Sequence, residues 1–192
     1  MRSILGAAVL WFGLTTGASH AHELSPAIAD LVVDRDRATL SITTNLEAIV
    51  ARIGPEHDST VGTPAEALYN DLRALPADAL AARYRIDGPE VAGLISLSAE
   101  GGPLTLTPSA PRVPEIGDTA LPRETELIFA LDIGDAQTAV FAWDASLGPI
   151  VLRVTRADGT DGFAGYLADG NASPPIDLIG EPPSVWQRLF GR

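Results

Sequence analysis

The fold is decided at residues 27–44, which run AIADLVV-DRDR-ATLSITT. In the second half of this stretch Leu40 and Ile42 alternate with small polar residues, and a period of two is typical of a half-buried strand. The four charged residues at 34–37 separate two short apolar runs, as the turn of a hairpin does. We therefore predict an antiparallel hairpin at the start of a fold built on β-sheet.

Helical spacing follows this hairpin twice. Residues 45–53 place Leu46, Ile49, Val50 and Ile53 on one helical face before Gly54-Pro55 ends the pattern. Residues 63–84 begin with Thr-Pro-Ala-Glu, in which threonine can cap a helix and glutamate can reach back to it. We predict that these helices form a short excursion between strands, outside the core.

Strand patterns return after Gly88, separated by glycine and proline. The candidate strands are residues 92–98, 103–107, 124–133, 138–143, 149–156 and 163–167. Many short strands at close spacing favour a sandwich over alternating strands and helices. The fold class that we predict is mainly β: an antiparallel β-sandwich of the Ig-like or CopC-like type, with the helical insertion at about 63–84.

Composition limits the class of protein. The chain has 192 residues, 46% of them apolar, which suits one globular domain, placed at residues 22–180. A formal charge of −12 argues against nucleic-acid binding, because the surface cannot neutralise a phosphate backbone. The absence of cysteine excludes disulfides, thiolate metal sites and a cysteine nucleophile.

The first 21 residues have the pattern of a secretory signal peptide. Arg2 precedes an apolar run at 4–14, and small residues surround Ser19-His20-Ala21, where a peptidase would cut. Cleavage after Ala21 gives an N-terminal His22, whereas cleavage after Ser19 gives His20. We expect a periplasmic or secreted protein, with an uncleaved N-terminal anchor as the alternative.

The C-terminal stretch has a different character. Pro174-Pro175 and Pro182-Pro183 predict a stiff extended tail, with a linker and a short aromatic segment at residues 181–192. Trp186, Leu189 and Phe190 share helical spacing there. Two interpretations stay open: this segment docks on its own domain, which we favour, or it contacts a membrane.

Three places in the chain resemble one family. They are Ala21–Ala27, the stretch from Phe141-Ala142-Trp143 to Gly148–Arg153, and the stretch from Ser173–Ile176 through Trp186–Phe190. Together they resemble the periplasmic domain of HupE/UreJ-like membrane proteins. The resemblance implies an extracytoplasmic accessory domain, linked to nickel enzymes and metal uptake and acting beside a membrane protein partner. Transport itself would belong to the family's transmembrane bundle.

Metal capture has its own support in the residues. An N-terminal His22 offers its amine and Nδ1, a chelate that suits Cu(II) and Ni(II). If cleavage leaves His22 third from the amine, backbone amides and the imidazole favour the same metals. His57 is the remaining histidine of the body, and Glu56 and Asp58 flank it, so that a carboxylate can add a ligand or orient the ring.

Other functions remain open beside this one. His57 can be an ordinary solvated loop residue, and oxygens at 56, 58, 59 and 60 could hold calcium, although the EF-hand spacing is missing. A protein-interaction sandwich without metal is the main alternative, with residues 63–84 or the aromatic tail as its contact surface. No Gly-x-Ser-x-Gly, phosphate loop or dinucleotide fingerprint occurs. We therefore expect no enzyme and identify no small-molecule substrate; a copper oxidase using His22 is the remote exception.

Overall fold

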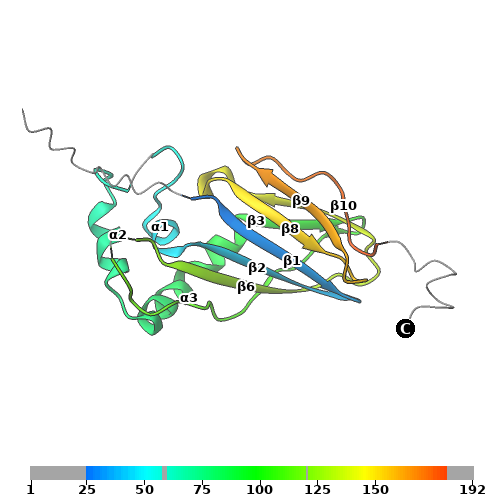
Figure 1. Ribbon diagram of the computed structural model, residues 1–192, viewed down its shortest axis with the longest axis horizontal. Coiled ribbons are helices and arrows are strands. Elements are labelled where there is room, and N and C mark those ends of the chain that lie inside the picture. The colour runs from blue at the N-terminus through cyan, green and yellow to red at the C-terminus, as the bar shows by residue number, and fades with distance from the viewer. Residues whose placement is uncertain (1–24, 58–59, 120, 181–192) are drawn as a thin grey trace, which may run out of the picture.

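Two β-sheets packed face to face make up the body of the protein (Figure 1). The computed structural model describes residues 25–57, 60–119 and 121–180. Within these residues the helices gather at one end of the sandwich, the end at which the chain enters the first strand (Figure 1). The predicted mainly β sandwich is confirmed.

The larger sheet grows from the predicted hairpin. Strands β1 (Ala27–Asp34) and β2 (Arg37–Asn45) pair antiparallel, with Leu31 opposite Leu40. The sheet order is β5-β6-β2-β1-β8-β9, completed by β5 (Thr107–Pro108), β6 (Glu124–Asp132), β8 (Ile150–Thr155) and β9 (Asp161–Leu167). Because β1 and β8 run parallel, this sheet is mixed and departs from the purely antiparallel prediction.

The smaller sheet has the order β10-β7-β3-β4. Its strands are β10 (Ile176–Asp177), β7 (Thr138–Trp143), β3 (Ile95–Ala99) and β4 (Gly102–Pro103). The predicted strand 103–107 is wrong, since Pro103 and Pro108 leave only two-residue pairings there. Residues 174–178 are not a free tail either, because Ile176 pairs with Ala139 and is 1% exposed.

Side chains alternate in and out of the sandwich along the strands. The fully buried ones form one cluster between the sheets, including Leu40, Ile42, Leu127, Phe129, Phe141 and Leu152. Trp143 is buried as well. A buried cluster of this size stabilises the fold mainly by removing apolar surface from water.

The helices belong to this core, contrary to the expectation that they lie outside it. They are α1 (Leu46–Ala51), α2 (Glu66–Arg73) and α3 (Ala77–Gly93), and Tyr69, Leu72 and Leu80 are buried with the sheet residues. Helix α3 continues through Gly88-Pro89, where we predicted an end near Tyr84. Its buried face, which includes Tyr84, Gly88 and Val91, stabilises it beyond that point. No described helix is both long and apolar enough to cross a bilayer.

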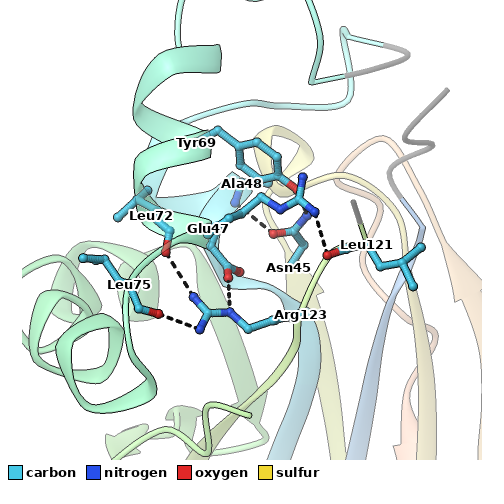
Figure 2. Close-up of polar contacts among 9 residues, drawn as sticks. Asn45, Glu47, Ala48, Tyr69, Leu72, Leu75, Leu121 and Arg123 are labelled. Carbon is cyan, nitrogen blue, oxygen red and sulfur yellow. Dashed lines mark hydrogen bonds and ion pairs between the residues drawn. The ribbon is translucent and has the colours of Figure 1, made fainter. Parts of the chain in front are cut away.

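A buried ion pair fastens the helices to the larger sheet (Figure 2). Arg123, just before β6, donates from Nε to Glu47 Oε1 on α1 at 2.6 Å, and neither side chain is more than 8% exposed. Its two other nitrogens donate to the carbonyl oxygens of Leu72 and Leu75, near the end of α2. Arg73 returns a bond to the carbonyl of Leu121 at 2.7 Å. Arg123 thus joins the start of β6 to α1 and to the end of α2.

Replacing Arg123 with alanine should destabilise the protein by about 3–5 kcal/mol, because it leaves the Glu47 carboxylate buried and unpaired. Urea unfolding measures the loss. Arg112→Ala is the matched control: the Arg112–Glu126 pair is exposed, so its removal should cost less than about 1 kcal/mol. Equal losses in the two variants would show that the buried pair does not hold the helices.

Tyr84 makes the free energy of unfolding depend on pH in the alkaline range. Burial raises the pKa of its phenol to about 12, and its hydroxyl has no hydrogen-bond partner among the described residues. Above pH 10 the unfolded chain loses this proton while the folded protein keeps it. Stability should therefore fall from pH 10 to 12 by up to roughly 3 kcal/mol. Chemical denaturation should show a smaller fall in Tyr84→Phe, and equal falls would contradict the assignment.

Candidate functional site

A cavity of about 540 Å³ opens at the helical end of the sandwich. Its walls come from the start of β1, from α1 and the loop after it, from the end of α3, and from the turn before β8. The volume lies in the range of small-molecule sites. The lining divides by polarity. We call its apolar side chains the floor, namely Ile49, Ile53, Val91, Leu94 and Leu147. We call its polar side chains the rim, namely Ser25, Arg52, Glu56, His57, Asp87, Glu90 and Ser146.

Local hydrogen bonds shape the loop that carries His57. Asn45 caps α1 by accepting from the Ala48 amide at 3.1 Å, and its own amide donates to the Tyr69 hydroxyl. Arg52 ends the helix with a φ of 57°, in the left-handed region, and its amide donates to the Ile49 carbonyl. The chain then turns through Gly54-Pro55 along the rim of the cavity.

Glu56 and His57 form a close pair on this loop. Glu56 Oε1 lies 3.5 Å from His57 Nε2, and the His57 side chain is about one-third exposed. The Glu56 side chain folds back over Gly54, so that a Cβ at Gly54 would meet its carboxylate and lie 3.1 Å from the Ser146 carbonyl oxygen. Two atoms held at this distance can both reach one metal ion, since metal–nitrogen and metal–oxygen bonds are near 2 Å.

A short 3₁₀ turn, η1 (Ala145–Leu147), lines the cavity next to the Gly54–Pro55 part of this loop. Asp144 caps it by accepting from the Ser146 hydroxyl at 2.6 Å and from the Ser146 amide at 2.9 Å, and these bonds lower the pKa of the Asp144 carboxyl. The indole N–H of Trp143 donates to the Gly148 carbonyl at 2.9 Å. A core tryptophan is therefore bonded to the end of the turn that lies beside the His57 loop.

Charges surround the mouth of the cavity. Arg52 donates to both carboxylate oxygens of Glu90, at 2.9 and 3.0 Å, and so links the loop to α3. Asp87 accepts from Arg83 one turn earlier on the same helix. The charged lining residues are Arg52, Glu56, Asp87 and Glu90. Their formal charges sum to −2 at neutral pH when His57 is counted as neutral. Such a mouth attracts cations.

The predicted metal residues are placed only in part. Glu56 and His57 come together on the rim, whereas His22 and Asp58 lie outside the described residues. Among residues 25–57, 60–119 and 121–180, no group of three or more histidine, aspartate or glutamate side chains could hold a metal ion. Ser25, three residues after His22, lines the same cavity as His57.

Two further features of the described residues bear on the site. The turn between β8 and β9 is held by Asp158, which accepts from the amide and hydroxyl of Thr160, and these bonds lower the pKa of its carboxyl. Tyr69 and Tyr84 pack in the core. The aromatic segment with Trp186, Leu189 and Phe190 lies outside the described residues.

Sequence reasoning missed Arg52, Asp87, Glu90 and the turn at Ser146. The Arg52–Glu90 pair leaves no local pattern in the sequence, because 38 residues separate its two members. Asp87 and Glu90 flank Gly88-Pro89, a pair that ordinarily marks a helix end and concealed their place on α3.

Comparison with known proteins adds no assignment: no family model matches the chain, and no curated protein matches it.

Gly54→Ala should move the Glu56 carboxylate away from His57 and lower stability by roughly 1–2 kcal/mol, because the added methyl presses on the Ser146 carbonyl as well. NMR shifts of the Glu56 carboxyl and the His57 ring report the displacement. Gly93→Ala is the control, since its new methyl meets nothing within 4 Å. Unchanged shifts in Gly54→Ala would mean that Gly54 does not set the Glu56–His57 geometry.

Proposed function

We propose that the protein is an extracytoplasmic, non-enzymatic accessory domain that captures Cu(II) or Ni(II) at the rim of the helical-end cavity. One observation carries the proposal: the chain enters the sandwich at Ser25, in the lining of the cavity whose rim bears Glu56 and His57. The acidic mouth described above adds electrostatic attraction for a divalent cation.

Chain length makes a shared site feasible. Three peptide steps connect Ser25 to His22, and an extended chain covers at most about 3.6 Å per residue. Three residues of chain can therefore span at most roughly 11 Å from Ser25. If the chain entered the sandwich at the opposite end, the length of the strands would separate His22 from His57.

The donor set fits the chemistry of these metals. After cleavage at Ala21, His22 supplies its amine and Nδ1, His57 supplies Nε2, and Glu56 supplies a carboxylate oxygen. Nitrogen-rich sets favour Cu(II) and Ni(II) over the hard cations Ca²⁺ and Mg²⁺. Asp58 is an additional candidate ligand in the sequence.

Calorimetric titration of the secreted protein with Cu(II) and with Ni(II) tests the proposal, after mass spectrometry has defined its N-terminus. We expect stoichiometric binding that weakens at least tenfold in His57→Ala and in a variant with one residue added before His22, because each change removes donors. Glu56→Gln should weaken binding, whereas Glu115→Gln, an exposed acidic residue outside the cavity, should not.

Two results would contradict the proposal. The first is no binding of either metal. The second is binding that His57→Ala leaves unchanged, which would mean a simple N-terminal chelate or scattered binding to acidic side chains rather than a site on this cavity.

A second candidate function rests on the outer face of the larger sheet. Val32 and Tyr166 are 46% and 61% exposed there, and no described helix covers that face (Figure 1). These residues favour a protein-interaction sandwich, the alternative expected from sequence, although the surface differs from the predicted one at 63–84. If metal binding fails, sedimentation velocity with the Val32→Glu variant should reveal whether this face supports association.

A further inference from the structure

The cavity beneath the Glu56–His57 rim is larger than a hydrated metal ion requires. Six waters at about 30 Å³ each account for roughly 180 Å³. The cavity holds about 540 Å³. A hydrated ion alone would therefore leave most of the cavity volume unfilled.

The floor of the cavity is apolar. Ile53 and Val91 are buried, and Ile49 and Leu147 are partly buried and pack on the core. Such side chains cannot replace the water shell of an ion, but they favour contact with hydrocarbon or aromatic surface. One cavity therefore combines a polar, metal-competent pair with apolar lining surface.

The donors named in the proposed function do not fill every position of the metal. Among the described residues His57 and Glu56 form a metal-compatible pair at the cavity, and the proposed function adds the amine and Nδ1 of His22. Six-coordinate Ni(II) bound by these four donors keeps two positions for donors that arrive with the ion. The formal charge of −2 on the lining residues favours a complex that keeps a positive charge.

We infer that the ligand of this cavity is a metal complex rather than a free ion: Cu(II) or Ni(II) held by a small organic chelator whose apolar part fills the floor. His57 and Glu56 bind open coordination positions of the metal, and Ile49, Ile53, Val91 and Leu147 contact the chelator. This inference rests on the proposed function and names its substrate class.

The test compares the affinities of the protein for aqueous Ni(II) and for the 1:1 Ni(II)–2,2′-bipyridine complex, which leaves four positions open on the metal. Calorimetry should show at least tenfold tighter binding of the complex. A tenfold gain needs only about 55 Å² of buried apolar surface, which is less than one face of the bipyridine can contribute.

A cavity-filling variant separates contact with the floor from contact with the metal. Leu147→Trp should abolish the preference for the complex, because the larger side chain fills the apolar part of the cavity that the chelator contacts. Leu104→Trp is the matched control, because Leu104 is also a partly buried leucine on the core but does not line the cavity. Thermal unfolding establishes that both variants fold, and the comparison on the unmodified protein stands without them.

The outcomes distinguish failure of this inference from failure of the proposed metal capture. Equal or weaker binding of the complex, with aqueous Ni(II) bound, overturns the inference and leaves metal capture standing. Failure of both Ni(II) and Cu(II), alone and as bipyridine complexes, overturns metal capture and the inference together. Binding of metal-free bipyridine as tightly as the complex also overturns the inference, since the cavity would then take the organic molecule without its metal; metal capture is judged by the aqueous ions alone.

Discussion

The helical end of the protein depends on the ion pair between Arg123 and Glu47. A carboxylate that is 0% exposed is costly to keep charged unless a partner is held against it, and Arg123 meets this need at 2.6 Å. The same guanidinium donates to the carbonyl of Leu72 on α2 and to the carbonyl of Leu75, just past the end of that helix. Glu47 stands beside Ala48, a lining residue of the cavity, so the contact that fastens α1 to the sheet also fixes one cavity wall.

The candidate site follows from this arrangement. The cavity lies where one end of the two sheets meets α1, α3 and the turn η1. The loop that carries Glu56 and His57 is held at its start by the cap of Arg52 on α1 and across the mouth by the Arg52–Glu90 pair. Side chains on such a supported loop can keep a binding geometry with little loss of conformational entropy. The acidic, partly apolar cavity then determines which ligands suit it.

The sequence predicted the strands well, because a period of two is local information, and the hairpin at 27–44 appears with its expected turn. It predicted Glu56 and His57 as neighbours for the trivial reason that they adjoin in the chain. The cavity could not be predicted, because its walls come from α1, α3 and η1, up to about a hundred residues apart. The Arg123–Glu47 pair spans 76 residues and has no local signature. Tertiary burial also overrode the local rule at Gly88-Pro89, where packing of α3 on the core outweighs the helix-breaking tendency of proline.

The most direct test of a metal site on this cavity is the paramagnetic broadening of backbone NMR signals by substoichiometric Cu(II). The account predicts that the amides of Ile53, His57 and Leu147 broaden first, since they surround the Glu56–His57 rim. Signals of Val32 and Asp158, at the other end of the sandwich, should persist (Figure 1). Early loss of the Asp158 signal, or uniform loss over the acidic surface, would contradict a metal site at the cavity.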